Sequence, residues 1–200
     1  MVFKYGLCVL VGYLLGNIQT SVLISKSVFS DDVRQHGSGN AGSTNMLRVF
    51  GRRAAIFTFI GDFMKGVVAI LFGELVSGGE LGSFSAVCAL AAVLGHNFPV
   101  FYGFRGGKGV ATTLAVMWLY EPGIGAVCTA VLLAIIVITG MVSLGSLVSM
   151  TLFSLMVVLF KGQDSPVTAL LFLVLWGLIV LRHKENIKRL VAGTESRLFK

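Results

Sequence analysis

A glycine-rich segment between residues 36 and 48 carries the first side chains that suit anion chemistry. Its sequence is His-Gly-Ser-Gly-Asn-Ala-Gly-Ser-Thr-Asn-Met-Leu-Arg. Such a backbone can turn its N–H groups toward an anion, and an arginine can hold a phosphate with two N–H bonds. The candidate phosphate ligands are Gly37, Ser38, Gly39, Asn40, Thr44, Asn45 and Arg48. A flexible loop without a ligand is the alternative for this segment taken alone.

A second glycine-rich segment, Gly106-Gly107-Lys108-Gly109, leads directly into an apolar run. It predicts a phosphate site at the start of a helix, where free N–H groups and the helix dipole favour anions. It is not a nucleotide P-loop, because Tyr102 stands where that motif requires glycine and Gly109 follows the lysine. His96 lies shortly before it, in the segment Gly-His-Asn-Phe-Pro. A basic loop that contacts lipid headgroups is the alternative.

Two further groups of polar residues accompany these loops. His183, Glu185 and Asn186 follow the last apolar run, and their side chains can hydrogen-bond a polyol. Asp62 and Lys65 lie inside an apolar run at spacing i, i+3, so they share one helix face. Ionisable groups at that depth usually face each other or a polar cavity. We expect either a simple ion pair or an ion pair that orients the neighbouring loops from below.

The elements that position these residues are membrane spans. The 200 residues are 56% apolar and 12% charged, whereas a soluble domain has about a quarter charged residues. Crossing a bilayer takes about 20 apolar residues. Seven apolar runs are present, at 5–24, 54–76, 83–100, 110–120, 123–139, 143–160 and 166–181. We therefore predict an all-α, polytopic transmembrane helical bundle of about seven spans, which excludes a soluble enzyme.

Two details of these runs bear on the bundle. The fourth run is short and ends at the turn signal Glu121-Pro122-Gly123, so a five-span bundle stays open.

Gly12 and Gly16 form a small-xxx-small pattern in the first run. That pattern predicts close packing of one helix against another.

The loops that hold the candidate residues also hold the positive charge. The net charge is +7, and 13 of the 16 Lys and Arg residues fall in the loops 25–53, 101–109 and 182–200. In a soluble chain this charge would suggest nucleic acid, but here the positive-inside rule makes these loops cytoplasmic. An odd number of spans then places the N-terminus outside and the C-terminus in the cytoplasm. We predict one integral membrane domain over residues 1–200, with no nucleic-acid partner and its active face in the cytoplasm.

Four segments together resemble one protein family over essentially the whole chain. They are Gly37–Asn45, Gly61-Asp62 with Lys65-Gly66, Gly95–Val100 with Gly106–Thr112, and Arg182–Ile187. In this order they are similar to the acyl-phosphate-dependent glycerol-3-phosphate acyltransferases of bacteria, the PlsY family. The sequence departs from the family pattern at Ala41, which is usually proline, and at Ser43, which is commonly alanine.

The resemblance implies an enzyme of the bacterial inner membrane. It would move a fatty acyl group from acyl phosphate to the 1-hydroxyl of glycerol 3-phosphate, giving lysophosphatidic acid and phosphate. Because acyl phosphate is a mixed anhydride with a good leaving group, neither a metal nor another cofactor is expected. Besides these substrates, the expected partners are membrane lipid and a soluble enzyme that makes acyl phosphate. A transporter of a phosphorylated solute is the alternative, although the polar motifs gather on one face and no internal repeat is evident.

The acyltransferase hypothesis gives each candidate residue a role. Five residues are assigned to hydrogen-bond the phosphate groups and the carbonyl oxyanion, where negative charge develops in the reaction. They are Ser38, Asn40, Thr44, Arg48 and Lys108. The other residues of the two phosphate loops are Gly37, Gly39, Asn45, Gly106, Gly107 and Gly109, and the glycerol hydroxyls are assigned to His183, Glu185 and Asn186. The general base stays open between His96, His183 and the phosphate dianion of glycerol 3-phosphate itself.

Overall fold

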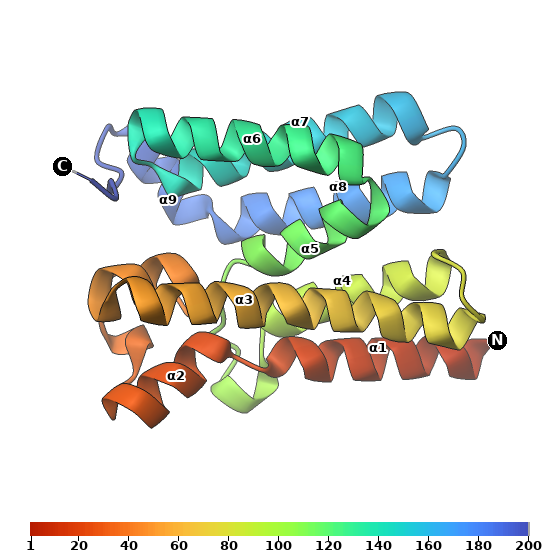
Figure 1. Ribbon diagram of the computed structural model, residues 1–200, viewed down its shortest axis with the longest axis horizontal. Coiled ribbons are helices and arrows are strands. Elements are labelled where there is room, and N and C mark those ends of the chain that lie inside the picture. The colour runs from red at the N-terminus through yellow and green to blue at the C-terminus, as the bar shows by residue number, and fades with distance from the viewer. Residues whose placement is uncertain (200) are drawn as a thin grey trace. The chain divides into compact units, whose positions relative to one another are not determined.

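The computed structural model describes residues 1–199, and over that range the chain forms helices and turns without a strand. The helices are α1 Val2–Asn17, α2 Thr20–Phe29, η1 Val33–Gln35, α3 Ser43–Ser77, α4 Ser83–Asn97, η2 Val100–Tyr102, α5 Val110–Tyr120, α6 Pro122–Thr139, α7 Val142–Lys161, α8 Pro166–Arg182 and α9 Lys184–Val191 (Figure 1). Each of the seven predicted apolar runs coincides with one or two of these helices, which confirms the all-α prediction. Lys200, one of the basic residues counted above, lies outside the described residues.

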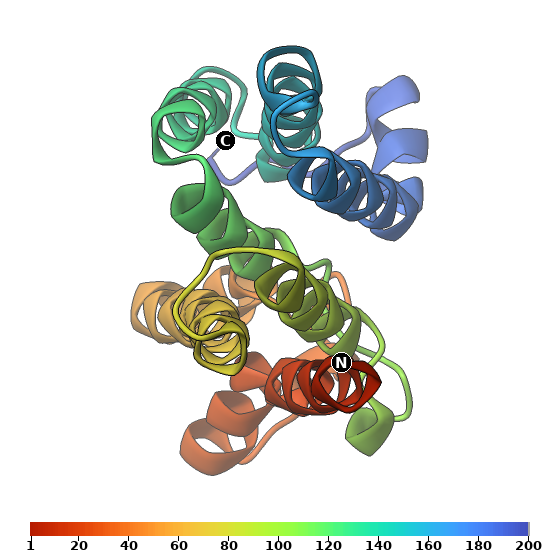
Figure 2. The same ribbon diagram turned by 90° about the vertical axis from the view of Figure 1, so that its right-hand side faces the viewer.

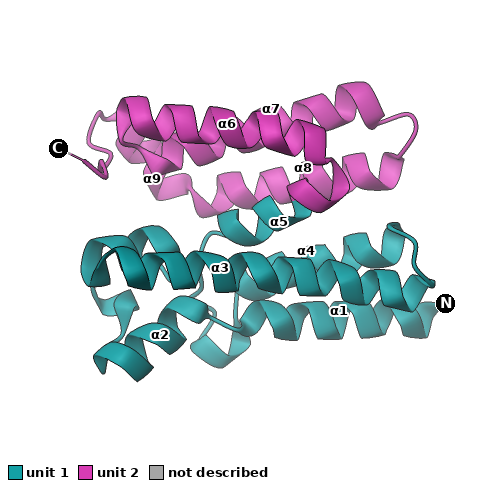
Figure 3. Cartoon of the chain, in the orientation of Figure 1, with its two compact units in different colours: residues 1–116 teal, residues 117–200 magenta. Residues whose placement is uncertain are grey.

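The chain forms two compact units, residues 1–116 and residues 117–200 (Figure 3). In the first unit α1 and α3 both pack against α4, and α2 lies against α3. In the second unit α6 packs against α7 and α7 against α8, while α9 follows α8 after a bend of 62°. Figure 2 shows the main helices of each unit nearly end-on, as small bundles.

Length and apolar character identify the segments that can cross a membrane. Five qualify within the described residues: Val2–Phe29, Ser43–Ser77, Ser83–Tyr102, Pro122–Thr139 and Val142–Lys161. The bent pair α8 and α9 makes a sixth if it is one span, whereas the 11 residues of α5 are too few for a full crossing. Large apolar side chains such as Leu75, Val137 and Ile138 are mostly exposed, as lipid-facing surfaces require. The protein is a polytopic helical membrane protein, and its orientation and exact number of spans stay predictions.

Glycine brings the backbones of α1 and α4 into contact. A Cβ atom added at Gly16 would collide with the carbonyl oxygen of Ala92, and one at Gly95 with that of Tyr13. Gly12 meets the α4 backbone in the same way. The predicted role of the Gly12 and Gly16 pattern in helix packing is therefore confirmed.

The helices break at two points, one inside the predicted run 5–24 and one at Gly51, just before the predicted run 54–76. The first run, predicted over 5–24, is split into α1 and α2 at Ile18, whose backbone is extended (φ −66°, ψ 97°). The helix α3 is broken at Gly51, where φ is 84°, a value that favours glycine. The first motif loop is also shorter than the predicted 25–53, because α2 continues to Phe29 and α3 already begins at Ser43. The Phe29 ring stacks on that of Phe50 with centroids 4.4 Å apart.

Candidate functional site

The first glycine-rich loop is folded by the side chain of Asn45. Its Nδ2 donates to the carbonyl oxygens of Val33 and His36, both at 3.0 Å, and its Oδ1 accepts from the backbone N–H of Ser38 at 2.9 Å. Asn45 is buried, and these bonds tie the loop to the start of α3. Asn45 was predicted to bind substrate, and in the structure its side chain holds the conformation of the loop.

The other candidates of this loop are more accessible than Asn45. Gly37 and Gly39 have φ values of 58° and 69°, so the turn depends on residues without a Cβ. The exposed candidates are Gly37, Ser38, Gly39 and Arg48, and the half-buried ones are Asn40 and Thr44. The structure places Thr44 and Arg48 in the first two turns of α3 and not in the loop where the sequence predicted them. Together with the loop's own hydroxyl and amide groups, they lie where a soluble anion can reach them.

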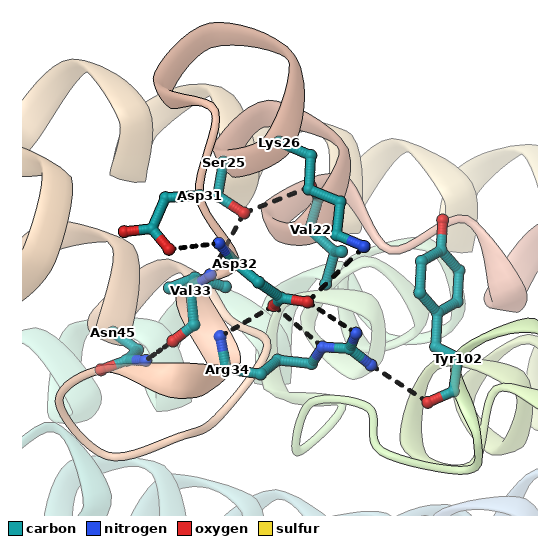
Figure 4. Close-up of polar contacts among 9 residues, drawn as sticks. All are labelled: Val22, Ser25, Lys26, Asp31, Asp32, Val33, Arg34, Asn45 and Tyr102. Carbon is teal, nitrogen blue, oxygen red and sulfur yellow. Dashed lines mark hydrogen bonds and ion pairs between the residues drawn. The ribbon is translucent and has the colours of Figure 1, made fainter.

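An ion pair that the sequence reasoning missed connects this loop to the turn before the second loop (Figure 4). The Nη2 and Nε atoms of Arg34 donate to Asp32 at 2.7 and 3.0 Å, and Nη1 donates to the Tyr102 carbonyl oxygen at 3.0 Å. The side-chain hydrogen bond from Arg34 holds the pKa of Asp32 at about 2, despite partial burial. Only the charges of Asp32 and Arg34 were evident from the sequence, because the third partner, the Tyr102 carbonyl oxygen that accepts from Arg34, lies 68 positions along the chain.

Replacing Arg34 by alanine is expected to loosen both loops. The change removes three hydrogen bonds and leaves the mostly buried Asp32 carboxylate without its main partner, which we expect to cost about 2 kcal/mol of stability. Thermal unfolding in detergent and the rate of proteolysis within residues 30–42 measure the effect. Arg105→Ala is the matched control, since Arg105 is exposed; an equal loss of stability in both variants would contradict the prediction.

The second glycine-rich loop folds back on the end of α4. The backbone N–H of Gly107 donates to the His96 carbonyl oxygen at 3.1 Å. A Cβ atom added at Gly107 would collide with His96 Nε2 and would lie 2.7 Å from the carbonyl oxygen of Ala41. Because Ala41 belongs to the first loop, the two glycine-rich loops and the His96 ring meet at Gly107. The candidate residues of this loop are the buried Gly106, Gly107 and Gly109 and the half-buried Lys108.

The expected ion pair inside α3 is present and buried. Lys65 Nζ lies 2.9 Å from Asp62 Oδ1, and both residues are at most 5% exposed. The pair is not isolated, because Lys65 Nζ also lies 2.7 Å from Nδ1 of the buried His96. The structure thus brings three predicted residues together beneath the second loop.

The second unit holds a separate polar cluster around the buried carboxylate of Glu195. This carboxylate accepts hydrogen bonds from Asn186 Nδ2 at 2.8 Å, Arg189 Nε at 2.9 Å and Ser143 Oγ at 3.0 Å. Of the predicted residues only Asn186 joins it. Glu185 is instead exposed and lies 3.2 Å from Lys188. The sequence reasoning did not assign Ser143, Arg189 or Glu195, because the tail must first fold back on α9.

His183 is buried where α8 meets α9. Its Nδ1 lies 2.8 Å from the carbonyl oxygen of Ile179. A carbonyl oxygen only accepts, so Nδ1 donates, and a neutral His183 then has its lone pair on Nε2.

Glu195 predicts a pH dependence of stability. Burial opposes its ionisation, but hydrogen bonds from Asn186, Arg189 and Ser143 lower its pKa below the ordinary 4.5. A depressed folded-state pKa contributes stability that is present above pH 4.5 and is lost as the pH falls through the folded-state value. We expect wild-type protein to lose thermal stability over this acidic window, and Glu195→Gln to be less stable near pH 7 and to lack this component. An identical acid profile in both proteins would contradict the assignment.

Comparisons with known proteins agree over nearly the whole chain. A family model described as glycerol-3-phosphate acyltransferase matches residues 6–193. The chain is 42% identical over 203 residues to a glycerol-3-phosphate acyltransferase of Clostridioides difficile, covering 98% of this chain and 97% of that one. It is 40% identical to the Thiobacillus denitrificans protein of that name, covering 97% of each. It also matches a crystal structure of PlsY (YgiH), an integral membrane glycerol 3-phosphate acyltransferase in its glycerol 3-phosphate form, with TM-score 0.89 and 36% identity over 97% of this chain and 95% of that chain.

Proposed function

The chain belongs to the glycerol-3-phosphate acyltransferase family, and on that basis we propose that it transfers a fatty acyl group from acyl phosphate to the 1-hydroxyl of glycerol 3-phosphate. The products are lysophosphatidic acid and phosphate. The observation that carries this proposal is the meeting of two glycine-rich loops at Gly107 and Ala41. Both substrates carry phosphate, so two adjoining loops with N–H, hydroxyl and cationic donors suit this pair of substrates.

The roles assigned from the sequence become part of this proposal. Phosphate and the carbonyl oxyanion are held by Ser38, Asn40, Thr44, Arg48 and Lys108, donors that act where negative charge develops. Asn45 acts indirectly, by folding the loop that carries Ser38 and Asn40 against the start of α3, which carries Thr44 and Arg48. The glycerol hydroxyls are assigned to His183, Glu185 and Asn186.

The proposed reaction is a direct acyl transfer. The 1-hydroxyl oxygen attacks the acyl carbonyl carbon, the bond from that carbon to the phosphate oxygen breaks, and phosphate leaves. The hydroxyl proton passes to a base. A neutral His183 can accept it at Nε2, because its Nδ1 donates to Ile179. The phosphate dianion of glycerol 3-phosphate is the alternative acceptor, and loss of turnover in His183→Gln with intact substrate binding distinguishes His183 from it.

We further propose that the protein lies in the bacterial inner membrane with its glycine-rich loops in the cytoplasm. The concentration of basic residues in the loops that carry the motifs supports this orientation. A soluble enzyme that makes acyl phosphate would deliver its product at the same face. Co-purification from gently solubilised membranes tests that partnership.

One assay tests the proposed activity. Purified protein in lipid receives glycerol 3-phosphate with either palmitoyl phosphate or palmitoyl-CoA. We expect phosphate release from palmitoyl phosphate that depends on glycerol 3-phosphate and is matched by lysophosphatidic acid. Product from palmitoyl-CoA but not from palmitoyl phosphate would refute acyl phosphate as the acyl donor. No product from either compound in a folded sample would refute the proposed function.

Replacing Lys108 by alanine tests the second loop as a phosphate site. Removing the ammonium group is expected to raise the KM for a phosphate substrate at least about tenfold, or to abolish turnover, because a charge-assisted hydrogen bond contributes about 1.5 to 3 kcal/mol. Steady-state kinetics with each substrate varied in turn measure the effect. Unchanged kinetics would exclude Lys108 from phosphate binding.

A further inference from the structure

The buried ammonium group of Lys65 has more acceptors around it than protons to donate. Its Nζ lies 2.7 Å from His96 Nδ1, 2.8 Å from the Ile18 carbonyl oxygen, 2.9 Å from Asp62 Oδ1 and 3.3 Å from the Gly16 carbonyl oxygen. An ammonium group has three N–H donors and no lone pair. Every one of these partners must therefore accept, and His96 Nδ1 is at the shortest distance of the four.

The charges nearby favour the positive charge on Lys65 and a neutral His96. Asp62 Oδ1 is 2.9 Å from Lys65 Nζ and 3.7 Å from His96 Nδ1. In a buried setting the closer pairing is the stronger one. Thr20 Oγ1 adds a neutral hydrogen bond to the same carboxylate oxygen at 3.1 Å. A neutral imidazole whose Nδ1 accepts carries its proton on Nε2.

The other ring nitrogen of His96 faces the meeting point of the two loops. His96 Nε2 and the Ala41 carbonyl oxygen both crowd the position that a Cβ of Gly107 would take. The His96 carbonyl oxygen accepts from the Gly107 N–H at 3.1 Å. His96 thus hydrogen-bonds to the second loop through its backbone carbonyl, and its ring faces the same loop.

We propose that Lys65 is a positioning residue that fixes the tautomer of His96, so that His96 presents an Nε2–H donor where the two glycine-rich loops meet. His96 then acts as a hydrogen-bond donor that holds the loops in register, and proton acceptance in the reaction falls to another group. The ion pair with Asp62 keeps the Lys65 charge in place inside α3. This role rests on the proposed function only for its effect on turnover.

The tautomer is tested without any assay of activity. The chain has three histidines, so His36→Gln combined with His183→Gln leaves His96 as the one imidazole for ¹⁵N nuclear magnetic resonance. We expect a pyridine-type signal from Nδ1 and a proton-bearing, pyrrole-type signal from Nε2 near pH 7. A proton on Nδ1, whether in the other tautomer or in an imidazolium, would overturn the proposal whatever the turnover of the wild-type enzyme.

Variants of His96 and Lys65 test the consequence for turnover. Glutamine can place an N–H near the Nε2 position, whereas the shorter asparagine cannot. We expect His96→Gln to retain at least ten times the kcat of His96→Asn, and Lys65→Met to lower kcat about 100-fold. Thr20→Val, which removes the neutral bond to Asp62 and leaves the Lys65 contacts, should stay within twofold of wild type. Equal loss in both His96 variants, or equal effects of Lys65→Met and Thr20→Val, would overturn the proposal.

Discussion

Gly107→Ala is expected to lower kcat/KM at least about 100-fold. The added methyl group would occupy space held by His96 Nε2 and press on the Ala41 carbonyl oxygen, so the ring or one of the two loops must move. A displacement of about 1 Å in groups that position substrate is enough for a loss of this size. Lysophosphatidic acid formation with each substrate varied in turn measures it.

The control for this variant is Gly123→Ala. No atom lies within 4 Å of a Cβ added at Gly123, and this glycine lies in the first turn of α6. We expect wild-type kinetics and unchanged or slightly higher stability for the control. Wild-type kinetics for Gly107→Ala itself would mean that the loops do not meet at this residue.

Gly95→Leu is expected to prevent the first unit from folding. A side chain at this position meets the Tyr13 carbonyl oxygen and the Cα of Gly16, so α1 and α4 cannot keep their close crossing. Overpacking a single site costs about 1 to 3 kcal/mol when side chains can yield, and here the obstructing atoms are backbone. Thermal unfolding and the monodisperse fraction after size-exclusion chromatography measure the loss.

Gly6→Leu is the matched control on the same helix α1. A Cβ at Gly6 meets no atom within 4 Å, so the larger side chain extends into open space that lipid can fill. We expect this variant to purify like wild type. Comparable losses in both variants would show that any leucine added in these helices is harmful. The loss in Gly95→Leu could then not be attributed to the close crossing of α1 and α4.

The helices and the two glycine-rich loops could be located from the sequence because each depends on local sequence. An apolar run forms a helix in a bilayer, since no other local structure satisfies its backbone. The break at Ile18 could not be predicted in this way, because Ile18 lies in an apolar run and its carbonyl bonds to Lys65, 47 positions away. The hydropathy of an apolar segment does not distinguish one straight helix from two helices joined at a residue such as Ile18.

The polar cluster of the second unit shows the same limit at shorter range. Glu185 and Asn186 are neighbours in sequence, but neighbours on a helix point about 100° apart, so only Asn186 faces inward. The acid that Asn186 meets is Glu195, which a turn at Gly193 (φ 67°) returns to α9. The residue types in the tail were informative, whereas their pairing depended on a turn that hydropathy does not encode.

The break between α1 and α2 also constrains how the chain enters its membrane. The first apolar segment reaches the bilayer with the Ile18 carbonyl turned away from helical partners, and the Lys65 ammonium group that bonds to it arrives 47 residues later. An unsatisfied carbonyl in the bilayer costs several kcal/mol. The segment formed by α1 and α2 therefore cannot hold its final conformation before α3, which follows it in the chain, has inserted beside it.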